Sequence, residues 1–266
     1  MPRDVGKPTI CAKWSPDNTC YAAAVKPTLC GLALLLLAAP AHAGRTHYGW
    51  LDGTEVVPER GVELETWVQD LDNVGPLERD ETLLWWAVTV GVTDQLELAL
   101  PLEVSWQRAG TVPGVTSLAR WGAEARYRFV SSDPVEAPAL VPLLRLAIKR
   151  EVDERRAATV EAEVALSYER GCLHAQLNLG ARQLLHAGED PILVRPAAGV
   201  SLAVTEDLRV GAEAVASVSA RGPGTTWLAA GPNLAWTFGR FWLAASVPVG
   251  VSKVDVAARV RWGIAF

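Results

Sequence analysis

Apolar and polar side chains alternate with a period of two along most of the chain, and this pattern limits the folds open to it. It is clear in residues 95–107, where one face carries Leu96, Leu98, Leu100, Leu102, Val104 and Trp106. Residues 254–266 alternate in the same way. Because successive side chains of a strand point to opposite faces, each such segment predicts a β-strand with one apolar face.

The alternating segments are long, and the links between them differ in length. Twelve strands are predicted, at 61–69, 81–92, 95–107, 117–130, 138–149, 158–169, 172–183, 191–204, 207–218, 225–238, 240–251 and 254–266. Tight links alternate with longer ones, at 70–80, 108–116, 150–157 and 184–190, although the link at 131–137 is longer than the other turns. An even strand number with short periplasmic turns is typical of bacterial barrels. The prediction is an all-β fold, a single antiparallel up-and-down transmembrane β-barrel over residues 61–266.

The chain begins with a region that resembles an export signal. Lys26 precedes a short apolar core at 32–37, and Ala41 and Ala43 form a small-x-small ending. This order is that of a secretory signal peptide, cleaved before Gly44. We therefore assign residues 1–43 to the signal region, with the functional signal at 25–43. Residues 44–60 do not alternate, and two readings stay open for them: a loose periplasmic leader or a partial plug of the barrel.

Composition argues against several kinds of chemistry. The formal net charge of −5 gives no reason to expect nucleic acid as a partner. After residue 43 the chain holds one cysteine, Cys172, and three dispersed histidines, His47, His174 and His186. These offer no metal-ligand spacing, and no nucleophile with a nearby base is evident. We expect no metal, no cofactor and no catalytic residue. An outer-membrane lipid-modifying enzyme remains an alternative.

Aromatic residues fall near the ends of the predicted strands. Amphipathic rings prefer the membrane interface, so two girdles are expected. At the outer rim we place Trp67, Trp85, Trp86, Trp106, Trp121 and Trp227. At the periplasmic rim we place Phe129, Trp236, Phe238, Phe241, Trp242 and Phe266.

The polar faces of the strands would line the lumen, since a buried charge facing lipid costs up to about 2–4 kcal/mol near the midplane. Neighbouring strands carry opposite charges, and closure of the ring would bring Arg259 and Arg261 beside Glu63 and Glu65. The residues expected to tune selectivity are Arg126, Arg128, Arg145, Arg259, Arg261, Glu97, Glu103 and Glu163. The predicted function is a narrow passive channel for small solutes. The alternative is a structural or adhesion barrel filled by these side chains.

Three short stretches resemble known outer-membrane proteins. Residues 259–266 resemble the closing strand of such barrels, whose terminal aromatic, here Phe266, is read by the barrel-assembly machinery. Residues 91–98 are similar to a phrase of the phenol-degradation-pathway (MetA-pathway) outer-membrane transporters, and 204–211 echo it. The resemblance implies a location in the bacterial outer membrane, with membrane lipid and the assembly machinery as partners.

Overall fold

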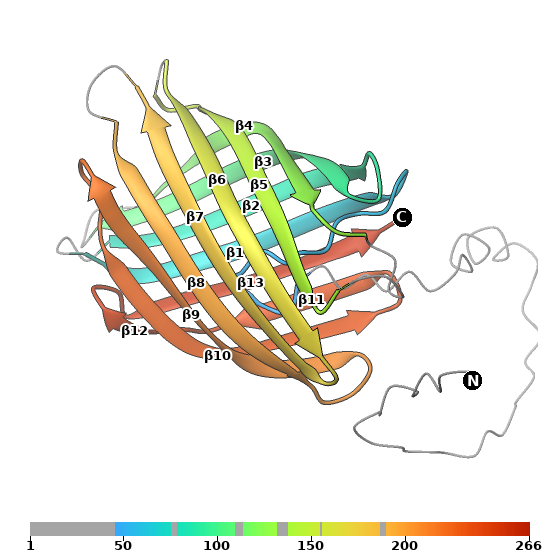
Figure 1. Ribbon diagram of the computed structural model, residues 1–266. Helices are drawn as coiled ribbons and strands as arrows, with labels where there is room; N and C mark the ends of the chain where they lie inside the picture. The colour runs from blue at the N-terminus through green and yellow to red at the C-terminus, as the bar shows by residue number, and fades with distance from the viewer. Residues whose placement is uncertain (1–45, 76–78, 110–113, 132–137, 155, 187–189) are drawn as a thin grey trace, which may run out of the picture.

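The computed structural model describes residues 46–75, 79–109, 114–131, 138–154, 156–186 and 190–266. Their regular structure is entirely β (Figure 1), in the strands β1 (Val62–Val74), β2 (Arg79–Gly91), β3 (Leu96–Ala109), β4 (Val115–Arg128), β5 (Leu140–Glu151), β6 (Ala158–Arg170), β7 (Leu173–Leu185), β8 (Ile192–Ala203), β9 (Leu208–Arg221), β10 (Trp227–Phe238), β11 (Phe241–Ser246), β12 (Val249–Ser252) and β13 (Val256–Ala265). Across these ranges, no helix is long and apolar enough to cross a membrane. The expected cleavage residues Ala41, Ala43 and Gly44 lie outside the described residues.

The strands form one closed antiparallel ring. From β1 to β11 each strand pairs with the next in sequence, and β1 also pairs with β13, from Glu63 opposite Ala265 to Asp72 opposite Val256. β11 and β12 share one position, because both pair with β10 on one side and with β13 on the other. The thirteen strands therefore occupy twelve positions, and the predicted twelve-stranded up-and-down barrel is confirmed.

The predicted strand 240–251 is interrupted, which the alternation did not indicate. Pro248 lies in the gap between β11 and β12. Proline has no N–H to donate to a ladder and is found at strand edges and irregularities. The carbonyl of Pro232 on β10 is instead met by Val247 N, at 3.3 Å. A single proline thus divides one strand of the ring into two.

The first strand is longer than predicted. β1 continues to Val74 and β2 starts at Arg79, so most of the expected loop 70–80 is strand. Polar residues continue the ladder there because they bond across it. The Thr82 hydroxyl donates to Asp70 at 2.7 Å, and Arg108 forms an ion pair with Asp80.

The two rims of the barrel differ. The links 92–95, 171–172, 204–207 and 239–240 are short and lie at the rim that we call the turn end. At the opposite rim, the loop end, β3, β5, β7 and β9 end and β4, β6, β8 and β10 begin. Four of the five links at the turn end are therefore the expected short turns, and the exception is the longer link from Arg128 to Leu140.

The outer surface of the barrel is apolar. Side chains such as Leu100, Val164 and Leu179 are more than half exposed, whereas the alternate residues point inward. Of the aromatic residues predicted for the two girdles, those exposed on the outside are Trp86, Trp106, Trp121, Phe129, Trp236, Phe238 and Phe266. This is the surface that a membrane-spanning barrel presents to lipid.

Four aromatic residues contradict the predicted girdles. Trp67, Trp85, Trp227 and Trp242 point into the barrel and are buried. The physical reason is strand parity: Trp67 is two residues from Glu65, so both side chains must lie on the inner face. Nearness to a strand end does not overrule this alternation.

Val164 tests the lipid-facing surface, because it lies at the middle of β6 with 54% of its surface exposed. We expect Val164→Arg to lower the free energy of folding into lipid vesicles by about 2–4 kcal/mol, measured by urea titration. Leu140→Arg is the matched control, since Leu140 is half exposed at the first position of β5, where the cost is about 0–1 kcal/mol. Equal losses at both positions would contradict a membrane-embedded outer surface.

Candidate functional site: the occupied lumen

Residues 46–60 are here called the inner segment, and all but the exposed last three, 58–60, lie within the ring of strands (Figure 1). Tyr48 and Leu51 have no exposed surface. At one end the Tyr48 hydroxyl lies 3.0 Å from His174 Nδ1 on β7. The last residue of the segment, Arg60, donates its N–H to the Gly91 carbonyl at the turn end, the same rim at which β7 begins with Leu173. The inner segment therefore occupies the lumen as a short loop of chain before β1 begins.

Trp50 of the inner segment contacts the barrel wall near the loop end. Its indole Nε1 donates to the Ala257 carbonyl at 2.9 Å, and its ring meets Trp227 edge to face at 5.7 Å. Ala257 and Trp227 lie at the loop-end starts of β13 and β10. The Glu213 carboxylate accepts the Trp50 backbone N–H at 3.1 Å. A backbone donor that would be costly to bury unpaired is thereby satisfied by the barrel wall.

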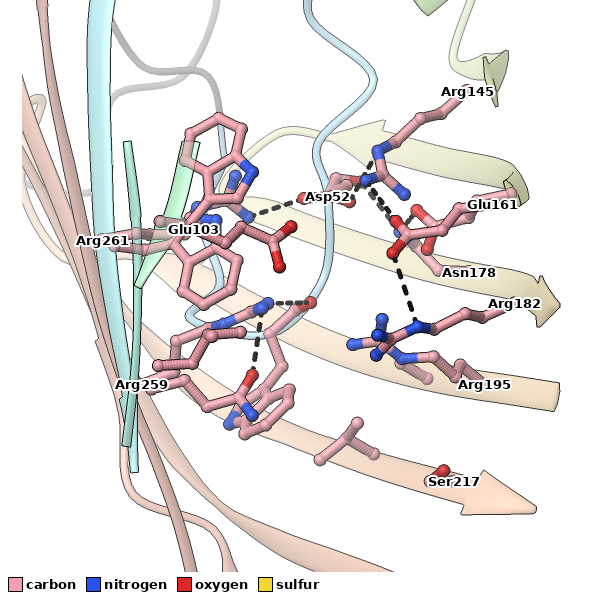
Figure 2. Close-up of a pocket in the computed structure, with 18 of the residues that line it drawn as sticks. Asp52, Glu103, Arg145, Glu161, Asn178, Arg182, Arg195, Ser217, Arg259 and Arg261 are labelled. Carbon is pink, nitrogen blue, oxygen red and sulfur yellow. Dashed lines mark hydrogen bonds and ion pairs between the residues drawn. The ribbon is translucent and has the colours of Figure 1, made fainter. Parts of the chain in front are cut away.

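Asp52 joins the two sides of the barrel through the inner segment. Arg261 Nη1 on β13 lies 2.9 Å from its carboxylate, and Arg145 Nε on β5 lies 3.7 Å away. Figure 2 shows Asp52 between these two arginines. Burial raises the pKa of the Asp52 carboxyl, but the charges of Arg261 and Arg145 outweigh burial and hold that pKa well below its usual range. The two guanidinium groups therefore favour the ionised form of Asp52.

The exit of the inner segment is fastened at the turn end. Arg126 donates to the Gly53 carbonyl, and Arg128 forms an ion pair with Glu55 at 2.6 Å. Glu97 accepts the Val57 N–H at 2.6 Å. Polar side chains of β3 and β4 thus hold successive residues of the inner segment.

One glycine makes this close approach possible. A Cβ at Gly91 would lie 1.9 Å from the Pro58 carbonyl oxygen, nearer than atoms can pack. Glycine is the residue that lets another backbone pass at this distance.

The charged faces of neighbouring strands are paired, as their opposite signs predict. On β3 and β4, Glu103 meets Arg120 at 2.6 Å, and Glu103 also meets Lys149 of β5 at 2.7 Å. On β6, Glu161 lies 2.8 Å from Arg145 and 3.2 Å from Lys149. All five side chains are largely buried, so these pairs are screened little by solvent.

Where β1 pairs with β13 and closes the ring, one of the two arginines forms the expected contact with a glutamate. Arg261 forms an ion pair with Glu65. Arg259 donates to Gln69 at 3.2 Å instead of to a glutamate. The register explains the difference, because Arg259 lies opposite Gln69 on β1 and not opposite Glu63.

A cavity of about 180 Å³ remains beside the inner segment. One part of its lining is aromatic: Trp67 and Trp85 stack at 5.8 Å, and the Arg259 guanidinium lies 4.0 Å from the Trp67 ring centroid. The opposite part carries Arg182 and Arg195 (Figure 2). This volume is below the range of about 300–1,000 Å³ for sites of drug-sized ligands. The cavity therefore suits a small solute.

The structure places all eight predicted lumen residues on the inner face, but in two groups. Those that line the cavity are Glu103, Arg126, Arg145, Glu163, Arg259 and Arg261. Glu97 and Arg128 lie at the turn end and bind the inner segment. Within the described ranges, no group of three or more histidine, cysteine or acidic residues could hold a metal ion.

Sequence reasoning missed several cavity residues as candidates for the site. Trp67 and Trp85 had a usable signal, because each shares its parity with an inward residue of the same strand. Arg182 and Arg195 were on predicted inner faces, but nothing in the sequence separated them from other arginines. Trp50 and Asp52 lie in a segment without periodicity, and so carried no signal.

A closed barrel with an apolar outer surface and polar residues inside is a transmembrane β-barrel of the bacterial outer-membrane type. No family model and no curated protein matches the chain. The resemblance to the phenol-degradation-pathway transporters therefore stays a prediction.

Solved structures provide the comparison. The β domain of the Bordetella autotransporter BrkA is 10% identical, with a TM-score of 0.51, over 77% of this chain and 99% of that chain. This likeness supports the fold. The NanC porin is 9% identical over 77% of this chain and 98% of its own, with a TM-score of 0.49. The translocator domain of the autotransporter NalP from Neisseria meningitidis is 12% identical over 77% and 88%, with a TM-score of 0.48.

Proposed function

We propose that this outer-membrane barrel is a narrow passive channel for small solutes, constricted by the inner segment and lined by charged side chains. The observation that carries the proposal is the cavity of about 180 Å³ inside the ring, bounded by residues of the inner segment and of the wall. A lumen wholly filled by side chains would leave no such space. Rings of charged side chains are a common means by which pores select solutes.

The polar lining favours a path for hydrated or charged solutes. The side chains of Glu103, Arg120 and Lys149 form a connected row of alternating charge along the wall. Because these charges are paired, the lumen has no large excess of either sign along this row. We infer that width and local charge together set selectivity.

The second candidate function is a structural barrel without transport. The full burial of Tyr48 and Leu51 favours it, because a tightly packed inner segment closes part of the lumen. The two functions differ in one property: a channel passes ions or solutes under a gradient, and a filled barrel does not.

We propose no catalytic role. His174 bonds to Tyr48 within the lumen, and is not at a lipid-facing rim where a lipid-modifying site would lie. The proposed partners are membrane lipid around the apolar surface and the barrel-assembly machinery at the last strand. Phe266, which is 64% exposed, continues the pairing of that strand with β1 by donating to Val62 O at 2.8 Å.

Single-channel recording of the purified barrel in a planar bilayer tests the proposal. We expect discrete openings whose conductance scales with salt concentration. Arg259→Gln removes a buried positive charge from the cavity and is expected to shift ion selectivity toward cations. Arg170→Gln is the control, since Arg170 is exposed on β6 at the turn end. A barrel that folds, shown by heat-modifiable migration, but never conducts would favour the structural function.

A further inference from the structure

Arg195 of β8 is a cavity residue that interacts with Glu161 and Glu163 at long range but forms no close ion pair among the described residues. Within the described part of the chain, no carboxylate oxygen lies within the 4.0 Å of an ion pair with its guanidinium, and no hydrogen-bond acceptor satisfies it. An arginine side chain has five N–H donors in a planar fork that matches a carboxylate. In the cavity, these donors face the space that a solute would occupy.

Arg182 of β7 lies beside Arg195. In the ladder Arg182 is opposite Leu193, and Arg195 is opposite Gly180, so the two arginines are diagonal neighbours on the inner face. Long side chains at such positions reach each other, and Figure 2 shows both extending toward the cavity. Among the residues that the structure describes, the carboxylate in ion-pair contact with Arg182 is Glu161, at 3.9 Å.

Glu161 cannot balance this pair of arginines, because it is already shared. Its carboxylate lies 2.8 Å from Arg145 and 3.2 Å from Lys149, both nearer than Arg182. The other nearby carboxylate, Glu163, accepts a hydrogen bond from Asn178 at 2.7 Å. The Arg182 and Arg195 side of the cavity is therefore rich in free N–H donors and poor in acceptors.

The rest of the cavity offers apolar surface. Val215, Trp227 and Leu71 are packed together there, next to Trp50 of the inner segment. The stacked Trp67 and Trp85 form the lining of β1 and β2. Small-molecule sites commonly combine apolar walls with a few convergent polar groups that fix orientation.

We propose that the cavity is a binding site for a small organic monoanion, with its carboxylate on Arg182 and Arg195 and its apolar body against the aromatic lining. The inference deepens the proposed channel function, on which it rests, by naming the class of solute. Planar recognition of a carboxylate by arginine forks supplies the specificity. The volume of about 180 Å³ limits the ligand to a single small body.

Binding to the wild-type barrel in detergent provides the first test. Cyclohexanecarboxylate is the probe, and binding is followed by calorimetry and by tryptophan fluorescence, since four tryptophans line the cavity. We expect cyclohexanecarboxylate to bind, and cyclohexylmethanol and cyclohexylamine to bind at least about tenfold more weakly, because they lack the anion. Acetate should also bind more weakly, because it lacks the apolar body. Equal affinity for the acid and the alcohol would overturn the proposal.

Variants locate the site. Arg195→Gln and Arg182→Gln are each expected to raise the Kd for cyclohexanecarboxylate by about tenfold or more, the effect of losing a charge-assisted hydrogen bond. Arg170→Gln, exposed at the turn end, should leave the Kd unchanged. Unchanged affinity in a folded Arg195→Gln barrel would overturn the assignment. A barrel that binds the acid but never conducts would contradict the channel function alone, and a conducting barrel that does not bind it would contradict this site alone.

Discussion

Deletion of residues 46–57 is expected to raise the single-channel conductance of the barrel several-fold. These residues form most of the inner segment: they enter the lumen beside His174, reach Ala257 near the loop end and return to Glu97 near the turn end. Their removal withdraws Trp50 and Asp52 from the interior while the ladder of the ring stays intact. The wall arginines freed in this way would face water, which replaces the lost hydrogen bonds. Planar-bilayer recording of the two proteins measures the effect.

A disulfide that fastens the inner segment is the complementary control. The Thr54 and Ser167 hydroxyl oxygens lie 2.6 Å apart, so cysteines at these positions place two sulfurs close to the bond length of about 2.05 Å. The pair is made in a Cys172→Ser background, because Cys172 is free. If the segment moves during transport, the oxidised Thr54→Cys/Ser167→Cys barrel conducts less than the reduced one. Unchanged conductance in both the deletion and the locked barrel would show that the inner segment does not limit passage.

Glu103→Gln is expected to lower the free energy of unfolding by about 3–5 kcal/mol, because it leaves buried positive charges uncompensated. Glu103 is 2% exposed and bridges Arg120 at 2.6 Å and Lys149 at 2.7 Å. Lys149 keeps Glu161 at 3.2 Å, but Arg120 retains only a longer contact to Glu151, at 3.8 Å. Urea titration of the barrel in lipid vesicles, with heat-modifiable migration as a check of folding, measures the loss.

Two variants separate this effect from a general loss of polar contacts. Glu103→Gln/Lys149→Gln removes one charge of each sign and should recover part of the stability. Asp80→Asn breaks the pair with Arg108, whose side chain is 52% exposed at the loop end, and should change the stability little because solvent screens this pair. A loss in Glu103→Gln as small as that in Asp80→Asn would show that the buried row of charges contributes little to stability.

The ring was predictable because one rule governs it. In a strand with lipid on one side and a polar interior on the other, alternate residues must be apolar. Leu100 and Val164 therefore indicate which face is the outer one. The same alternation places Glu103 and Arg126 inside. Opposite charges on neighbouring strands predicted the contacts of Glu103 with Arg120, because antiparallel neighbours share a register.

Positional reasoning that ignored this rule failed. Trp67, Trp85 and Trp227 were assigned to a rim because they lie near strand ends, yet their parity directs them into the lumen. Proximity to a strand end is a weak guide, since a residue there still points to one face or the other. Pro248 shows where the alternation itself misleads. The side-chain pattern is continuous there, but the missing N–H of the proline interrupts the strand.

Period-two alternation was therefore enough to predict the class of fold, the number of strand positions and which side chains face inward. For residues 44–60 the sequence left two readings open, a loose leader or a partial plug, and only the tertiary structure places this part of the chain in the lumen. The inner segment has no repeating pattern, and its position depends on contacts such as that of Asp52 with Arg261, 209 residues away in the chain. The unpaired state of Arg195 likewise depends on where every nearby carboxylate finds its partner. The pairing of charged side chains inside a closed ring depends on the whole assembly of strands, so it cannot be predicted from local sequence.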